Sequence, residues 1–190
     1  MPLPAWINLT TVIVAVIILI LLYIIFTFNR LIVLRNRIGN AWSQIDVQLK
    51  RRFDLIPNLV EAVKGYMKHE RGTFETITKA RAAMAKATTI SEKAGADNML
   101  AGALKTLFAV AENYPKLKAS QNFMMLQEEL SGTESKIAYA RQFYNDTVLS
   151  FNNTIQQFPG RIIASMMGYK HHEFFQAESP AEKKPVKVKF

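Results

Sequence analysis

The stretch RRFDLIPNLVEAVKGYMKHE, residues 51–70, has the apolar periodicity of a helix but carries a proline. Its apolar residues recur three or four positions apart, as they do on one face of a helix: Leu55, Ile56, Leu59, Val60, Val63 and Met67. Pro57 has no backbone N–H and hinders the turn before it. Asp54 is a good N-cap residue and would place Pro57 in a first turn, where proline is tolerated. We therefore expect one helix to end near Arg52 and an antiparallel helix to begin at Asp54.

A continuous helix through the proline is the alternative, because apolar residues keep one heptad phase across it: Trp42, Leu49, Ile56, Val63 and Ile77. A helix unbroken from Arg30 to Ala87 would be about 87 Å long at 1.5 Å per residue. The remaining segments could not cover such a helix evenly. Compactness therefore favours a turn at Pro57.

Before this region lies an apolar segment without any charged residue, INLTTVIVAVIILILLYIIFTF, residues 7–28. As a helix it would be about 33 Å long, which matches a hydrocarbon core of about 30 Å. A basic start and a small-x-small cleavage site are both missing, so we interpret it as a retained single-pass transmembrane helix. Arg30, Arg35 and Arg37 form a membrane-proximal basic group after it, and no charged side chain precedes it. The positive-inside rule then puts residues 1–6 outside the plasma (inner) membrane and the C-terminal domain in the cytoplasm.

Composition excludes several classes of protein. The chain has a net charge of +9 and no cysteine, so disulfides, thiolate nucleophiles and thiolate metal sites are ruled out. The positive excess flanks the apolar segment and marks the C-terminal tail, whereas a nucleic-acid-binding domain usually carries it on one face. This distribution favours a membrane surface as partner and argues against nucleic acid.

The rest of the chain is predicted to be helical, and no strand alternation is present. After the helix that follows Asp54, we expect a third helix over residues 94–113, with a cap at Ser91, and a fourth that Ser120 caps and Pro159 stops. The fourth has a coiled-coil-like heptad repeat that includes Phe123, Leu130, Ile137, Tyr144 and Phe151. The predicted fold is all-α: the transmembrane helix continues into an antiparallel four-helix bundle over residues 29–160. A short amphipathic segment, 161–175, and a disordered basic tail, 176–190, follow it.

No catalytic constellation is present in the sequence. His69 lacks a second histidine four residues on, and the paired Glu-x-x-His motifs of a di-iron bundle are missing. Neither a glycine-rich phosphate loop after a strand nor a serine nucleophile elbow can be found. We therefore predict a protein that is not an enzyme and that has no catalytic residue, cofactor or metal site.

Three segments carry a resemblance to a known family: NAWSQIDVQLKRRFDLIPNLVEAVKGYMKHE (40–70), ENYPKLKASQNFMMLQEEL (112–130) and TESKIAYARQFYNDTVLSFNNTIQQFPG (133–160). In this order they resemble the bacterial LemA family. The resemblance implies a single-span membrane protein with a helical-bundle domain and no established biochemical activity. Some relatives are associated with magnetosome membranes, and family genes often neighbour those of membrane-bound zinc proteases. A scaffold that forms homo-oligomers at the lipid membrane is therefore expected, and an adaptor or regulator of such a protease is the alternative.

The first of these segments supplies the candidate interaction residues: Asn40, Trp42, Asp46, Arg51, Arg52, Asp54, Pro57 and Asn58. A structural interpretation makes them a buried aromatic residue, helix caps and a turn, for which these residue types are commonly used. A functional interpretation makes them a polar surface for self-association or for a partner. The sequence alone favours the structural interpretation.

Overall fold

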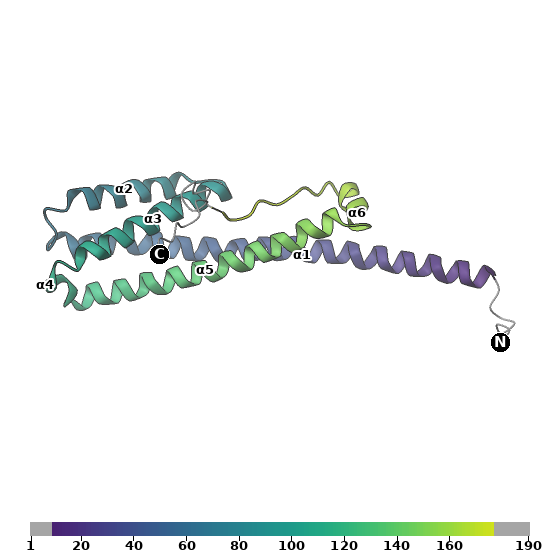
Figure 1. Ribbon diagram of the computed structural model, residues 1–190, viewed down its shortest axis with the longest axis horizontal. Helices are drawn as coiled ribbons and strands as arrows, with labels where there is room; N and C mark the ends of the chain where they lie inside the picture. The colour runs from purple at the N-terminus through teal and green to yellow at the C-terminus, as the bar shows by residue number, and fades with distance from the viewer. Residues whose placement is uncertain (1–8, 177–190) are drawn as a thin grey trace, which may run out of the picture. The chain divides into compact units, whose positions relative to one another are not determined.

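The computed structural model describes residues 9–176, and every regular element within them is an α-helix (Figure 1). The helices are α1 (Leu9–Lys64), α2 (Arg71–Lys86), α3 (Ile90–Ala111), α4 (Pro115–Lys118), α5 (Gln121–Gln156) and α6 (Gly160–Met166). The prediction of an all-α chain with a long apolar N-terminal helix is confirmed. The predicted head, residues 1–6, and residues 177–190 of the predicted tail lie outside the described part of the chain.

The chain divides into two compact units, each made from two separate stretches. Unit 1 comprises Met1–Asn40 and Asp146–His172, and unit 2 comprises Ala41–Asn145 and Glu173–Phe190. Helices α1 and α5 are long enough to contribute to both units.

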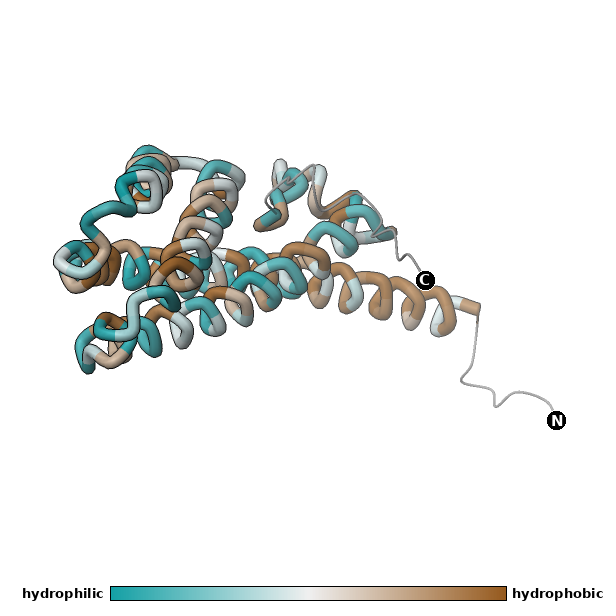
Figure 2. Tube along the Cα trace, turned by 60° about the vertical axis from the view of Figure 1, so that its left-hand side comes forward, coloured by the Kyte–Doolittle hydropathy of each residue, from teal (hydrophilic) through white to brown (hydrophobic). Residues whose placement is uncertain are grey.

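The N-terminal part of α1 is predominantly apolar, as Figure 2 shows by its mostly brown colour. Within residues 9–176, α1 contains the one stretch long and apolar enough to cross a bilayer, and none of the side chains in that stretch is buried in the protein. Thr27, near the end of the predicted span, donates its hydroxyl hydrogen bond to the carbonyl oxygen of Tyr23 at 2.8 Å. A long apolar helix whose side chains are not buried in the protein is typical of a membrane span.

The buried apolar residues of unit 1 come from α1, α5 and α6: Leu31, Leu34, Ile38, Val148, Phe151, Ile155, Ile163 and Ala164. The chain after α6 returns to α5 in the same unit. The Asn152 side chain exchanges two hydrogen bonds, each 3.0 Å, with the backbone of His172. The Phe151 ring lies 5.6 Å from that of Tyr169 and 5.1 Å from that of His172, between ring centres.

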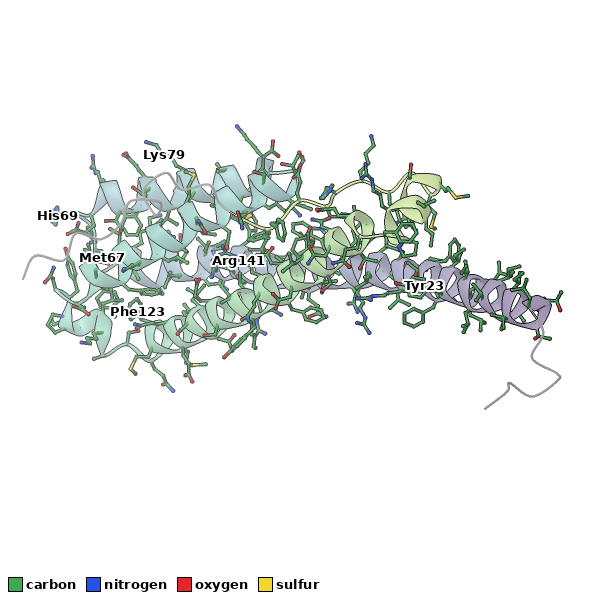
Figure 3. The ribbon with its side chains drawn as sticks, turned by 45° about the vertical axis from the view of Figure 1, so that its right-hand side comes forward. Tyr23, Met67, His69, Lys79, Phe123 and Arg141 are labelled. Atoms are coloured by element: carbon green, nitrogen blue, oxygen red, sulfur yellow. The ribbon has the colours of Figure 1, made fainter. Side chains whose placement is uncertain are left out.

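Unit 2 contains an apolar core to which α1, α2, α3, α4 and α5 all contribute. Figure 3 labels two of its members, Met67 in the loop after α1 and Phe123 at the start of α5. The others include Ile56, Leu59, Val63, Ile77, Leu100, Leu104, Leu107, Leu117 and Leu130. These side chains have the helical spacing that the sequence showed, and their burial is the main stabilising contribution to this unit.

The predicted helix end near Arg52 and the predicted cap at Asp54 are wrong. Helix α1 runs through Pro57 and ends at Lys64, and the chain reverses over residues 65–70. A proline inside a helix costs about 3 kcal/mol relative to alanine. Burial of Ile56, Leu59 and Val63 on the same turns offsets this cost. The alternative of a helix through the proline is correct, although that helix ends far before Ala87.

The start of α3 also differs from its predicted position. Its cap is Thr89 and not Ser91, because Thr89 and Glu92 form a capping box. The Thr89 hydroxyl accepts a hydrogen bond from the Glu92 amide at 3.2 Å, and the Glu92 carboxylate accepts from the Thr89 amide at 3.0 Å. Helix α5 begins directly after Ser120, as predicted.

Candidate functional site

All eight candidate interaction residues lie on α1, but they differ in exposure. Asn40 closes the first stretch of unit 1, and the other seven belong to unit 2. Arg52 is buried, and Trp42 and Pro57 are half-buried. The exposed members are Asn40, Asp46, Arg51, Asp54 and Asn58. The stretch therefore presents both an inward and an outward set of polar groups.

Arg52 is the centre of a buried ion cluster in unit 2. Its guanidinium donates a 2.5 Å hydrogen bond to the Asp97 carboxylate on α3 and pairs with Glu134 on α5. The guanidinium of Arg141 on α5, labelled in Figure 3, lies 3.9 Å from the second oxygen of Asp97. Arg52 is only 1% exposed and Asp97 only 2%. The cluster joins three helices, because its members come from α1, α3 and α5.

Burial dominates the electrostatics of this cluster. It raises the pKa of Asp97, although the neighbouring Arg52 and Arg141 act in the opposite direction. It lowers the pKa of Arg52 against the attraction of Asp97. The Nε atom of Arg52 has no hydrogen-bond acceptor within the described residues. Such a pair contributes geometric specificity more than net stability, and either partner alone would be strongly unfavourable.

Trp42 forms a second cluster, with aromatic and cationic neighbours. Its ring centre lies 5.9 Å from that of Tyr144 and 6.1 Å from that of Phe175. The Lys93 ammonium lies 5.3 Å above the Trp42 ring and pairs with Asp46, one helical turn after Trp42. Trp42 and Asp46 thus act together to hold the start of α3 against α1.

The segment after His172 is fastened to this aromatic cluster. The Tyr144 hydroxyl donates to the Glu173 carbonyl at 2.9 Å, and Asn145 exchanges two hydrogen bonds with the backbone of Phe175. Burial, followed by the charge of Glu173, raises the pKa of Tyr144 to about 12. Arg141 lies over the Phe175 ring at 5.0 Å, so one residue belongs to both clusters.

The exposed candidate residues make fewer side-chain interactions than the buried ones. Arg51 forms an exposed 2.7 Å ion pair with Glu129 on α5. Asp54 and Asn58 make no side-chain hydrogen bond or ion pair with the described residues. Pro57 lines a shallow groove between α1 and α2 together with Phe53, Val60, Ile77 and Arg81.

The three membrane-proximal arginines lie on α1 in unit 1, and all three are exposed. Arg35 stacks over the Tyr169 ring at 5.5 Å, while Arg30 and Arg37 lie on either side of it along the helix. Burial and the positive charge of Arg35 lower the pKa of His172. His172 therefore tends to be neutral near pH 7, which suits its packing against Phe151.

The surface of unit 2 carries an apolar groove between α1 and α5. Its volume is about 560 Å³, and its lining residues are Ser43, Gln44, Val47, Gln48, Lys136, Tyr139, Ala140 and Phe143. Val47 is 62% exposed, Tyr139 73% and Phe143 49%. The Gln48 side-chain oxygen is buried at this groove without a hydrogen-bond donor from the described residues. The groove thus combines exposed apolar side chains with polar residues at its edge.

Among residues 9–176, no three His, Asp or Glu side chains lie close enough together to bind a metal ion. His69, labelled in Figure 3, is exposed in the loop between α1 and α2. The arrangement offers buried ion pairs, aromatic contacts and an apolar groove. It is suited to holding helices together and to binding another surface.

Sequence reasoning missed the partners of the candidate residues, which are Lys93, Asp97, Glu129 and Glu134. One signal could have found Asp97. It takes a position on the apolar stripe of α3, three residues after Ala94 and three before Leu100, both of which are buried. A charged residue at a core position requires a buried partner of opposite charge, and Arg52 takes such a position on α1.

Comparison with known proteins finds similarity to one protein family and to several of its relatives. The sequence profile of the LemA family matches residues 41–190. Protein LemA of Metamycoplasma hominis is 30% identical over 154 residues, which cover 78% of this chain and 68% of that protein. The magnetosome protein MamQ 2 of Paramagnetospirillum magneticum is 34% identical over 92 residues, or 48% of this chain. The MamQ protein of Magnetospirillum gryphiswaldense is 30% identical over the same length.

The two magnetosome proteins are matched over only 34% of their own length, so their remaining parts have no counterpart in this alignment. The family profile covers most of the chain, including both ion-cluster arginines, the aromatic cluster and the groove. A 30% identical relative over 78% of the chain agrees with it. The chain belongs to the LemA family.

Proposed function

We propose that this protein is a membrane-anchored helical scaffold that works by association and catalyses no reaction. In this proposal residues 7–28 span the plasma membrane, and unit 2 acts as an antiparallel four-helix bundle that binds a second copy of the chain. One observation carries it: the exposed apolar groove between α1 and α5 on the unit that lies outside the span. Large exposed apolar groups that cluster on a water-facing surface are typical of interaction sites.

The chemistry of the groove favours a protein occupant over a small molecule. Val47, Tyr139 and Phe143 form an apolar centre, and Lys136 and the two glutamines form a polar rim. This is the anatomy of a protein interface, in which aromatic anchors are surrounded by hydrogen-bonding groups.

A second copy is the occupant that we favour. A two-fold interface brings the same patch together with itself, so it must be self-complementary. The exposed apolar centre of the groove, formed by Val47, Tyr139 and Phe143, can pack against the same centre of a second copy. Anchoring in the bilayer confines the copies to two dimensions and raises their effective concentration, so weak contacts suffice.

The test uses the full-length protein in native-lipid nanodiscs and compares two substitutions of equal charge. Tyr139→Lys places a charge in the groove, and Thr106→Lys places one on the exposed face of α3. We expect Tyr139→Lys to reduce the oligomeric fraction at least fivefold by mass photometry, and Thr106→Lys to leave it unchanged. An unchanged oligomeric fraction in Tyr139→Lys would contradict the proposal.

Crosslinking at the same position identifies the occupant. Because the chain has no cysteine, Tyr139→Cys introduces a single thiol. Oxidation in the native membrane is expected to give a disulfide-linked dimer. A bifunctional maleimide-to-amine reagent that instead joined this thiol to a membrane protease would favour the adaptor role over the scaffold.

The orientation forms part of the proposal. Arg30, Arg35 and Arg37 are exposed on α1 directly after the apolar segment, as expected of residues on the cytoplasmic side. We therefore place unit 2 in the cytoplasm and the first residues of the chain outside the cell.

A further inference from the structure

The corner between α5 and α6 in unit 1 exposes large apolar side chains to an unusual degree. Phe158 is 81% exposed, Ile162 53% and Met166 83%. The surrounding sequence is nearly free of charge, since residues 147–169 contain one charged side chain, that of Arg161. A water-facing turn of a soluble domain is usually polar, so this corner has the composition of a segment with apolar surroundings.

This corner lies against the apolar segment of α1. Together they enclose a groove of about 510 Å³ between Phe158, Pro159, Ile162, Ile163 and Met166 on one side and Val16, Leu19, Ile20, Tyr23 and Ile24 on the other. Tyr23, labelled in Figure 3, belongs to the α1 wall. Every residue that lines the groove is apolar or aromatic.

The α1 wall fixes the depth of the corner. At 1.5 Å per residue, Ile24 lies about 6 Å and Val16 about 18 Å along the helix from Phe28, the last residue of the predicted span. If residues 7–28 cross the bilayer, Phe158 and α6 therefore lie within the hydrocarbon and not above it. The chain then returns to the level of the basic residues, because Tyr169 stacks with Arg35.

Most main-chain amides of the corner are hydrogen-bonded within the protein. In hydrocarbon each main-chain amide needs a partner from the protein. The amides of Arg161, Ile162, Ile163 and Met167 donate to carbonyl oxygens within the corner at 2.8–3.4 Å, and the Gln157 amide donates to the Asn153 carbonyl of α5 at 3.1 Å. Gly160 is held so tightly that an added Cβ would come within 2.1 Å of the Thr154 carbonyl oxygen.

We infer that the α5–α6 corner, residues 157–167, is a second membrane contact that re-enters the bilayer beside the span and binds lipid acyl chains. The inference rests on the proposed function, because it takes residues 7–28 as the span. The occupant follows from continuity, since one wall of the groove is the surface that lipid would cover if residues 7–28 span the bilayer. The single charge, on Arg161, reaches the headgroups through its long aliphatic stem.

The test measures contact with lipid at single thiols, which the cysteine-free chain allows. Phe158→Cys and Met166→Cys report on the corner, Leu19→Cys on the span and Ser91→Cys on an exposed position of α3. Each full-length variant is labelled with an environment-sensitive fluorophore. It is then placed in phosphatidylcholine–phosphatidylglycerol vesicles with or without lipids that carry a nitroxide on the acyl chain.

We expect the nitroxide lipid to quench the labels at positions 158 and 166 to within twofold of the label at position 19, and to leave position 91 unquenched. Quenching at position 19 without quenching at 158 and 166 would overturn the inference and leave the membrane anchor intact. No quenching at position 19 would overturn the membrane anchor itself. Corner labels shielded from aqueous iodide but not quenched by lipid would show a protein partner there, which also overturns the inference.

Discussion

Arg52 combines deep burial with a full positive charge, and its neighbours explain how unit 2 accommodates it. The carboxylates of Asp97 on α3 and Glu134 on α5 accept hydrogen bonds from its two terminal nitrogens. The attraction between Arg52 and Asp97 is opposed by the loss of hydration, as the pKa directions of both groups show. The cluster therefore selects one register of α1, α3 and α5, because any other arrangement would leave a buried charge alone.

The first prediction concerns this pair. Asp97→Ala is expected to destabilise the protein by about 3 kcal/mol, since Arg52 would remain buried with only the half-exposed Glu134. The double variant Arg52→Met, Asp97→Ala is expected to cost less than the sum of the single variants by about 1–3 kcal/mol. Urea unfolding of the detergent-solubilised protein, followed by tryptophan fluorescence in a Trp6→Phe background that leaves Trp42 as the reporter, measures these free energies. Additive single effects would show that the two charges do not depend on each other.

The second prediction concerns the capping box of α3. Hydrogen bonds from the Thr89 and Thr88 amides lower the pKa of Glu92 from 4.5 to about 2. An acid whose pKa is lower in the folded state stabilises that state above its unfolded pKa, and this contribution is lost as the pH falls through the folded pKa. The stability difference between the wild-type protein and Glu92→Gln should stay constant from pH 7 to about pH 5.

Below that range the same difference should shrink as the pH approaches 2, because both proteins then carry a neutral side chain at position 92. Comparison with Glu92→Gln isolates this group from the other carboxylates of the chain. Urea midpoints at several pH values provide the measurement. A difference that did not change with pH would mean that the cap does not depend on the charge.

At the scale of elements, α1 runs through Pro57 because a periodic apolar face outweighs one missing hydrogen bond. The third prediction is that Pro57→Ala changes stability more than Asp54→Ala does, which is the reverse of the order expected for a turn capped by Asp54. Pro57→Ala restores the amide that can donate to the Phe53 carbonyl and should stabilise the protein by about 1–3 kcal/mol. Asp54→Ala should change stability by less than about 0.5 kcal/mol, because Asp54 is an exposed residue inside a helix. Chemical unfolding of both variants distinguishes a continuous helix from a helix capped by Asp54. A cost of more than about 1 kcal/mol for Asp54→Ala alone would support the cap and contradict the continuous helix.

The same stretch shows how far the sequence could predict the fold. Helical character and the apolar positions follow from periodicity, and the core of unit 2 is built from those positions. The end of α1 does not follow, because a proline in a helix is decided by tertiary packing that local rules omit. The capping box at Thr89 was readable, since Thr-x-x-Glu stands in the sequence.

The candidate site could be predicted only in part for a related reason. Arg52 and Trp42 stood in a recognisable motif, but their partners Asp97, Glu134, Tyr144 and Phe175 lie far away in the sequence. Such pairings depend on how the helices are arranged, which one sequence does not specify. The apolar groove is likewise formed by two helices and cannot be seen on either alone.

At the scale of the whole molecule, charge and hydropathy predict one orientation in the membrane. Every exposed arginine near the span follows it, and a translocated basic group would have to cross the hydrocarbon and oppose the membrane potential. The fourth prediction is that a thiol in unit 2, introduced as Thr106→Cys on α3, reacts with a membrane-impermeant maleimide only after the cells are permeabilised. Leu3→Cys, before the span, should react in intact cells.

Both variants contain a single thiol because the natural chain has none, so the labelled band reports one position. The two positions act as controls for each other, since the proposed orientation requires opposite results in intact cells. Labelling of Thr106→Cys without permeabilisation, together with protection of Leu3→Cys, would invert the orientation. The association surface would then face the outside of the cell, where a cytoplasmic partner could not reach Val47, Tyr139 and Phe143.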